Sequence, residues 1–168
     1  MTVEFQIVGA EPEDAGSMLR IQARAVRAMT EGVYGAAVLE EWASSLTGRH
    51  LEGLTERMRA GTEAALLAAT KDEGVVGFGS LIPASSRLRT LCVDPAFSGR
   101  GAGTSILLAL AEKARGHGLT HLPLESSLNA VALYQRHGFA IDREGSYLLA
   151  SGASMRCVYM TKLIAGRN

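Results

Sequence analysis

The sequence lacks a surplus of charge of either sign. Lysine plus arginine and aspartate plus glutamate both number 17, so the 168-residue chain has a formal net charge of zero. A neutral chain provides no electrostatic footprint for nucleic acid or for an anionic membrane. The sequence also lacks an apolar run of the length that crosses a bilayer. We therefore expect neither nucleic acid nor a membrane among its partners.

Cysteine is scarce, and no targeting segment is visible. Cys92 and Cys157, the two cysteines, lack the spacing of metal ligands, so we predict no metal site. The first 14 residues contain no basic segment followed by an apolar one, which a signal peptide would need. We expect reduced thiols in a cytoplasmic protein. No repeat or low-complexity linker interrupts the chain, so we expect one domain over residues 1–168.

The periodicity of apolar residues predicts a mixed α/β chain. The expected strands cover residues 2–8, 64–70, 75–82, 87–93, 121–125, 139–149 and 154–163. The expected helices cover residues 15–30, 36–45, 51–60, 103–117 and 129–137. This order favours a partly antiparallel sheet with helices around it over a doubly wound parallel sheet. Residues 30–60 are polar and interrupted by glycine, and we expect this segment to face the substrate.

A glycine-rich turn stands between a predicted strand and a predicted helix. Gly99, Gly101 and Gly103 fall within five residues, which lets the backbone turn tightly and approach a ligand closely. The first N–H groups of the following helix have no partner inside the helix, and the helix dipole is positive there. Such a place binds anions, above all phosphate oxygens. We interpret the turn as a pyrophosphate-binding site.

Two other phosphate-binding motifs compete with this interpretation. A P-loop requires a lysine before Thr104, and Gly103 occupies that position. A dinucleotide-binding fold requires a third glycine where Thr104 stands, but Glu125 lies about 22 residues after Gly103, which suits a ribose-binding acid. A dinucleotide-binding oxidoreductase domain therefore stays open as an alternative.

Three motifs follow one another over about 50 residues. They are Leu91–Pro95, Gly99–Gly103, and the set Asn129, Ala130, Tyr134, Gly138 and Phe139. Together they resemble the GNAT superfamily of acyl-CoA-dependent N-acyltransferases. The family's pyrophosphate signature begins with Arg or Gln, whereas this chain has Ser98 there. Because backbone N–H groups provide most of the contacts, we expect weaker coenzyme binding rather than its loss, with Arg100 as a neighbouring source of charge.

The resemblance implies a fold, a reaction and a set of site residues. The fold is of α+β type, a mixed and mostly antiparallel sheet of six to seven strands flanked by helices. The reaction transfers the acetyl group of acetyl-CoA directly to a primary amine of a small molecule or a protein. The implied coenzyme-binding residues are Leu91, Cys92, Val93, Ser98, Gly99, Arg100, Gly101, Ala102, Gly103, Thr104 and Asn129. The resemblance also allows a homodimer through the last strands, which include Tyr147 to Met160.

Tyr134 is the catalytic residue that the resemblance implies, as the group that protonates the departing thiolate. A phenol, with an ordinary pKa of about 10, is a suitable donor to a thiolate. No general base is predicted, since Glu125, His121 and His137 each have a simpler surface role and a water chain can remove the amine proton. The missing base and Ser98 leave a second alternative open, a non-catalytic acyl-CoA sensor on the same fold.

The segment between residues 30 and 60 contains further candidates for the substrate side. Tyr34 and Trp42 either line a substrate pocket or pack between helices. The cationic run of Arg49, His50, Arg57 and Arg59 is typical of a solvated helix face.

Overall fold

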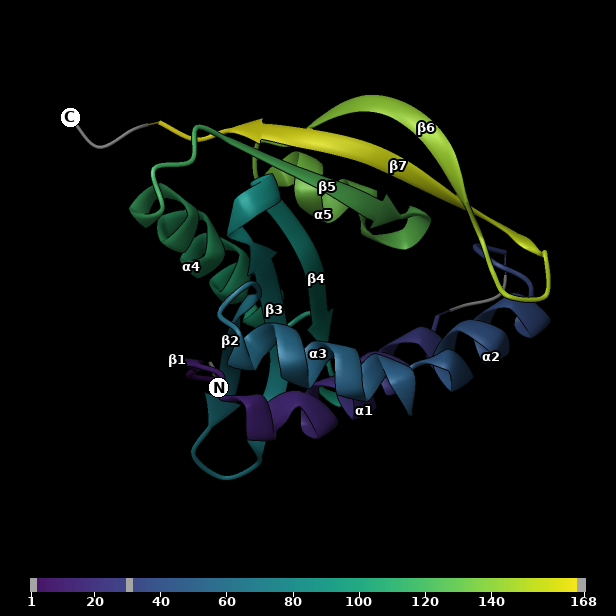
Figure 1. Ribbon diagram of the computed structural model, residues 1–168, viewed down its shortest axis with the longest axis horizontal. Helices are drawn as coiled ribbons and strands as arrows, with labels where there is room; N and C mark the ends of the chain where they lie inside the picture. The colour runs from purple at the N-terminus through teal and green to yellow at the C-terminus, as the bar shows by residue number, and fades with distance from the viewer. Residues whose placement is uncertain (1–2, 30–31, 166–168) are drawn as a thin grey trace.

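The strands form two antiparallel sheets in the computed structural model, which describes residues 3–29 and 32–165. The first sheet has the order β1 (Gln6–Gly9), β2 (Ala64–Thr70), β3 (Gly74–Ile82) and β4 (Arg87–Val93). The second has the order β5 (His121–Ser127), β7 (Ser154–Leu163) and β6 (Ala140–Leu148). Neighbouring strands of both sheets run antiparallel (Figure 1).

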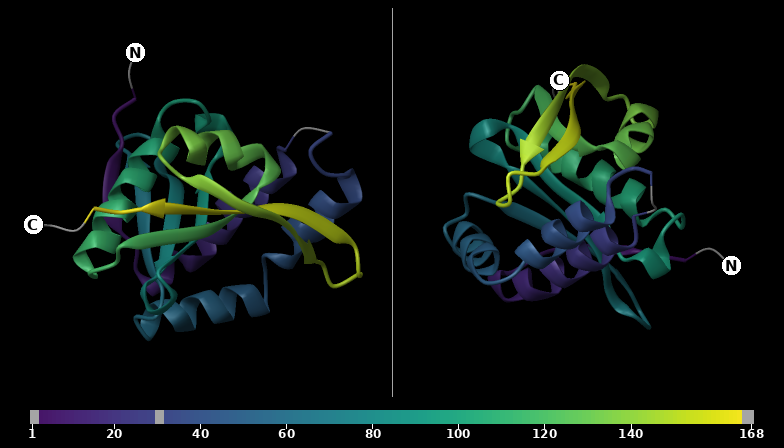
Figure 2. Two further views of the ribbon diagram at one scale, coloured as in Figure 1. Left: turned by 90° about the horizontal axis from the view of Figure 1, so that it is seen from above. Right: turned by 90° about the vertical axis from the view of Figure 1, so that its right-hand side faces the viewer.

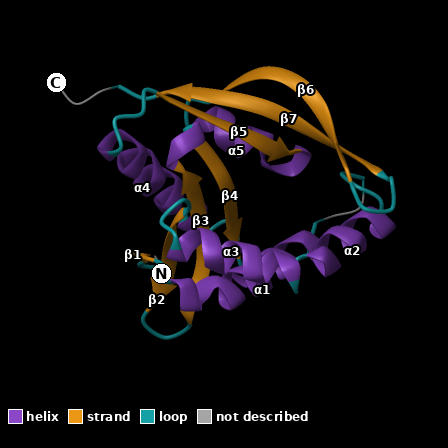
Figure 3. Cartoon of the chain, in the orientation of Figure 1, coloured by secondary structure: helices purple, strands orange, loops and turns teal. Residues whose placement is uncertain are grey.

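Helices pack on both faces of the first sheet (Figure 3). The α-helices of the described residues are α1 (Ala15–Arg27), α2 (Ala36–Ser45), α3 (Arg49–Arg59), α4 (Ala102–Gly116) and α5 (Val131–Arg136). Of these, α4 lies on one face of the first sheet, and α1, α2 and α3 lie on the other. The short 3-10 helices there are η1 (Pro12–Asp14), η2 (Pro83–Ser85), η3 (Pro95–Phe97) and η4 (Leu128–Ala130). Within residues 3–29 and 32–165, no helix has both the length and the apolar character that a membrane span requires.

The predicted elements are present, with some ends displaced. The helix expected over residues 15–30 ends at Arg27, and residue 30 lies outside the described residues. The helix expected over 51–60 begins two residues earlier, at Arg49. The strand expected over 2–8 covers Gln6–Gly9, and residue 2 also lies outside the described residues. The helix expected over 129–137 is divided into η4 and α5.

The prediction of one sheet is corrected in one respect, because the seven strands are divided between sheets of four and three. Among the described residues, β4 pairs with β3 alone and β5 with β7 alone, so β4 and β5 diverge without a hydrogen-bonded ladder (Figure 1). A bulge bends β4 near this point, since Thr90 opposes Ser80 and Leu88 opposes Leu81 while Arg89 has no opposite residue. The antiparallel pairing also overturns the dinucleotide-binding alternative, which requires a parallel sheet.

Among the described residues, two apolar clusters hold together the layers that Figure 2 shows. One cluster joins the first sheet to α4 and to the second sheet, and the other joins the first sheet to α1, α2 and α3. The α4 helix packs closely because β3 carries Gly79, where an added Cβ would lie 2.6 Å from Leu110 Cδ1 and 2.7 Å from Ile106 Cγ2. This close contact fixes the position of α4, and therefore of the glycine turn at its N-terminus.

Candidate active site

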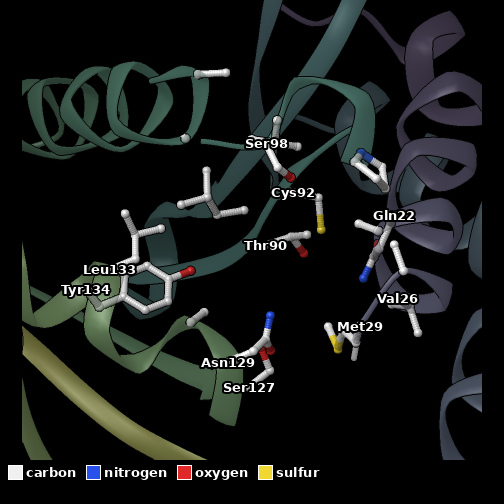
Figure 4. A pocket seen from close by; sticks show the side chains of 18 of the residues that line it. Gln22, Val26, Met29, Thr90, Cys92, Ser98, Ser127, Asn129, Leu133 and Tyr134 are labelled. Carbon is white, nitrogen blue, oxygen red and sulfur yellow. The ribbon is translucent and has the colours of Figure 1, made fainter. Parts of the chain in front are cut away.

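A cavity of about 880 Å³ lies between β4, α1 and the turn that precedes α4 (Figure 4). β5 and α5 close its other side. Its lining includes Gln22 and Val26 of α1 and Met29 just after it, the β4 segment from Leu88 to Val93, and the turn from Ser98 to Thr104 without Arg100. It also includes Glu125, Ser127, Asn129, Leu133 and Tyr134. The cavity thus brings together ten of the eleven coenzyme-binding residues predicted from the sequence, and Tyr134.

The turn before α4 leaves its backbone N–H groups open to the cavity. Gly101 is the N-cap of α4 with φ of 94°, a left-handed conformation that favours glycine, and it provides no side chain to cap the helix. The first turn of α4 contains no acidic residue. The positive end of the helix dipole and the unpaired N–H groups therefore remain available to an anion.

Arg100 is the predicted residue that does not line this cavity. Its guanidinium lies over the ring of Phe97, with Cζ 5.4 Å from the ring centroid. Ser98, which replaces the long polar residue of the family signature, does line the cavity. The charge of Arg100 is therefore close to the turn but is directed toward Phe97, and its coenzyme role stays a prediction.

Asp94 fixes the start of this turn. Its buried carboxylate accepts a hydrogen bond from the backbone N–H of Ala96 at 3.0 Å, which caps η3. The same carboxylate forms an ion pair with Arg24 of α1, at 2.9 Å between Nη1 and Oδ2. The start of the glycine turn is consequently tied to α1.

The free edge of β4 forms one wall of the cavity. Leu91, Cys92 and Val93 pair with β3 on one side only, and no strand of the described part of the chain pairs with their other edge. An extended ligand can add to such an edge by main-chain hydrogen bonds. Burial raises the pKa of the Cys92 thiol to about 12, so this thiol stays protonated and is a poor nucleophile at neutral pH.

Tyr134 directs its hydroxyl into the cavity from α5 (Figure 4). The residue is only 5% exposed, and its ring meets Phe139 edge to face at 5.4 Å between centroids. Burial raises the pKa of the phenol well above its ordinary value, with a smaller contribution from Cys92. The phenol is therefore a proton donor in its resting state, held rigidly by its ring contacts.

The backbone before α5 is held by Tyr34, from the loop after α1. The Tyr34 hydroxyl accepts a hydrogen bond from Leu128 N at 3.0 Å and donates one to Arg156 O at 2.6 Å. Its ring meets Trp42 edge to face. Tyr34 thus positions η4, whose Asn129 lines the first cavity together with Ser127. Tyr34 was expected either to line a substrate pocket or to pack between helices, and these contacts show the packing role.

A second cavity, of about 570 Å³, adjoins the first. Both cavities share Gln22, Trp42, Arg89, Thr90, Glu125 and Ser127 in their lining. Among the described residues, Glu125 is the carboxylate common to both, and its Oε2 lies 3.2 Å from Nη2 of Arg87. The site therefore has two compartments that meet at β4 and β5.

One residue of the helix face that the sequence suggested as solvated, Arg57, is half-buried beside this second cavity. His50 and Arg57 line it, and Arg57 Nε lies 2.7 Å from Oε2 of Glu63. The sequence prediction was wrong for Arg57 alone, because its partner Glu63 comes from the segment that follows α3. The other residues of the cationic run are exposed as expected, namely Arg49, His50 and Arg59. The sequence prediction also did not identify Arg87 and Arg89, whose alternation in a β-prone segment was the available signal.

Metal ligands do not gather at either cavity in the part of the chain that the structure describes. Within residues 3–29 and 32–165, no three His, Cys, Asp or Glu side chains are close enough together to hold a metal ion. His121 lies outside both linings, and His137 contacts Leu133 O through Nδ1 at 2.9 Å.

Comparisons with known proteins identify a family and a fold. The family model described as "Acetyltransferase (GNAT) domain" matches residues 28–155. No curated protein matches the chain significantly. Among solved structures, a GCN5-related N-acetyltransferase from Rhodopseudomonas palustris matches with a TM-score of 0.85 and 24% identity, over 97% of this chain and 98% of that one.

Two further solved structures contain the coenzyme. The PaiA N-acetyltransferase from Thermoplasma acidophilum, in complex with coenzyme A, has a TM-score of 0.74 and 17% identity, with 95% of this chain and 99% of that one covered. YncA from Salmonella typhimurium, with acetyl-CoA, has a TM-score of 0.70 and 18% identity, with 98% and 96% covered. At these identities the likeness shows the fold.

Proposed function

Because the chain belongs to the GNAT acetyltransferase family, we propose that it transfers the acetyl group of acetyl-CoA to a primary amine by direct attack. The observation that carries this proposal is the first cavity, which joins three features in one space. They are the open N-terminus of α4, the free edge of β4 and the phenol of Tyr134. An acyl-CoA has a pyrophosphate, a pantetheine arm and a thioester sulfur. The N-terminus of α4 would bind the first, the edge of β4 would bind the second, and Tyr134 would protonate the third as it departs.

The coenzyme is the substrate that the first cavity suits. Its pyrophosphate would accept hydrogen bonds from the N–H groups between Gly101 and Thr104. Its pantetheine arm would lie along the free edge of Leu91 to Val93. The coenzyme A and acetyl-CoA found in PaiA and YncA support this assignment, since both proteins share the fold.

The acceptor amine would enter from the second cavity. It must be neutral to attack, and Glu125 is well placed to accept its proton because it lines both cavities. Attack on the thioester carbon places negative charge on the carbonyl oxygen, which the N–H groups of β4 can stabilise. As the intermediate collapses, the bond from carbon to sulfur breaks and Tyr134 donates its proton to the departing thiolate.

Direct attack fits the state of the thiol in the cavity. An acyl-enzyme route would require a cysteine thiolate, whereas the raised pKa of Cys92 keeps its thiol protonated at neutral pH. Acceptors of two kinds, a small-molecule amine and a protein amino group, are open to such a site. The cytoplasmic location and the homodimer remain predictions from the sequence.

The experiment that tests this proposal measures free thiol released from acetyl-CoA across a panel of primary amines. Amine-dependent thiol release, with one acetylated amine per thiol by mass spectrometry, would support the transferase. Coenzyme binding with no turnover on any amine or protein amino group would contradict it and favour the non-catalytic sensor.

A further inference from the structure

The second cavity is lined by more arginines than its ion pairs on the β4 side use. Arg57 is paired with the buried Glu63 at 2.7 Å, and Ser80 donates a hydrogen bond to the other Glu63 oxygen at 2.6 Å. Arg87 is paired with Glu125 at 3.2 Å. These contacts occupy both carboxylates on the β4 side of the cavity.

Arg89 lines the same cavity but takes part in neither of these two close pairs. Its closest carboxylate contact joins Nε to Oε1 of Glu63 at 3.8 Å, which is beyond hydrogen-bond range, and that oxygen already accepts from Ser80. No hydrogen bond of the Arg89 guanidinium occurs within residues 3–29 and 32–165. Arg89 therefore has its donors available to a ligand.

The position of Arg89 also favours a ligand. It is the extra residue of the β4 bulge, and a bulge redirects a side chain relative to the regular alternation of a strand. The side chain is 41% exposed and lines both cavities. Burial lowers the pKa of the guanidinium, and the arginine nonetheless stays charged at neutral pH. A bound anion would compensate for the hydration that the charged guanidinium loses through its partial burial.

The other carboxylate of this cavity, Glu41, does not supply that anion. Its oxygens accept hydrogen bonds from Ser151 N at 2.8 Å and Ser151 Oγ at 2.6 Å, which hold it at the loop between β6 and β7. The pKa of Glu41 is lowered, chiefly by the Ser151 side chain and then by its backbone.

We infer that the acceptor is a small primary amine that also carries a carboxylate, and that Arg89 binds this carboxylate in the second cavity. The inference rests on the proposed acetyl transfer and adds the substrate class. Arginine matches a carboxylate through two parallel N–H donors. Since Arg89 and Glu125 line both cavities, a carboxylate bound by Arg89 leaves a nearby amine at the junction where acetyl transfer would occur. Arg89 thereby determines specificity without touching the reacting atoms.

The test compares amino acids with their carboxamides, such as leucine with leucinamide and phenylalanine with phenylalaninamide, by thiol release from acetyl-CoA. The carboxamide is nearly isosteric but neutral, and its amine loses a proton more easily. An enzyme that ignores the carboxylate would therefore prefer the carboxamide. We expect the opposite, a kcat/KM for the best free acid at least about tenfold above that of its carboxamide.

Substitution at Arg89 assigns this preference to one side chain. In Arg89→Gln, kcat/KM for the acid should fall at least about tenfold, mainly through KM, while the carboxamide should be little changed. Arg89→Lys should restore part of the preference. The matched control is Arg59→Gln, on the exposed side of α3 and outside both linings, which should behave as wild type.

Three outcomes would overturn the inference. Two of them need only the wild-type enzyme: it acetylates no carboxylate-bearing amine, or it prefers the carboxamides. The third is an equal loss for acid and carboxamide in a natively folded Arg89→Gln. If amines without a carboxylate are acetylated, the proposed acetyl transfer still stands, so its failure and the failure of this inference are distinguishable.

Discussion

Tyr134 is the residue on which catalysis is expected to depend. Its hydroxyl points into the first cavity while its ring is packed against Phe139. Tyr134→Phe removes the proton donor and keeps the ring, so kcat should fall about 100-fold, the size typical of a general acid. Coenzyme affinity and the free energy of unfolding should change little.

The control for this substitution is Tyr159→Phe. Tyr159 lies on β7 outside both cavities, under the guanidinium of Arg143. It should retain wild-type turnover. Unchanged kcat in Tyr134→Phe, measured by thiol release at saturating substrates, would remove the acid role.

Cys92 should make the stability of the protein decrease with rising pH in the alkaline range. Burial raises its pKa from 9.0 to about 12, so above pH 9 the unfolded chain releases a proton that the folded chain retains. The contribution of this thiol to the free energy of unfolding should therefore be constant below pH 9 and fall toward pH 12, by on the order of a few kcal/mol.

Urea unfolding of wild type and Cys92→Ala at a series of pH values checks this dependence. The variant should be less stable at pH 7, because its side chain is smaller, and should show a shallower decline above pH 9. The buried phenol of Tyr134, whose pKa is also raised, contributes a further decline at higher pH in both proteins. Parallel profiles for the two proteins would contradict the assignment to Cys92.

At the scale of elements, the turn between β4 and α4 was predictable because its cause is local. Glycine at 99 and 101 permits the positive φ values of 73° and 94°, and the following apolar positions specify the helix. The division into two sheets was not predictable, because it depends on the bulge at Arg89 and on contacts between distant strands. The partnership of Arg57 with Glu63 likewise exists only in the folded chain.

The η4 turn shows how a distant element positions part of the site. Tyr34→Phe would leave Leu128 N without its acceptor and Arg156 O without its donor. We expect a loss of about 1–3 kcal/mol in the free energy of unfolding, and a lower kcat because η4 precedes the helix of Tyr134.

Thermal and urea unfolding of Tyr34→Phe, with turnover at saturating acetyl-CoA, measures both effects. Tyr159→Phe again provides the matched comparison. A variant with wild-type stability would show that the two hydrogen bonds do not hold η4.

At the scale of the whole molecule, we predict that the coenzyme stabilises the folded chain. A ligand present at 100 times its dissociation constant raises the free energy of unfolding by about 2.7 kcal/mol. For a chain of this size, that corresponds to an increase of roughly 5–10 °C in the melting temperature. NAD, which also contains a pyrophosphate, should give little increase, because it has no pantetheine arm for the edge of β4. Equal increases with NAD and coenzyme A would contradict the assignment of that edge.

Titration calorimetry of acetyl-CoA into the wild-type chain, at two temperatures, tests the central claim most directly. We predict saturable heat with one coenzyme per chain, and weaker binding by Gly101→Ala, in which the left-handed turn before α4 is strained by about 1–2 kcal/mol. A natively folded chain that gives no saturable heat with acetyl-CoA at either temperature would contradict the claim that this cavity binds the coenzyme.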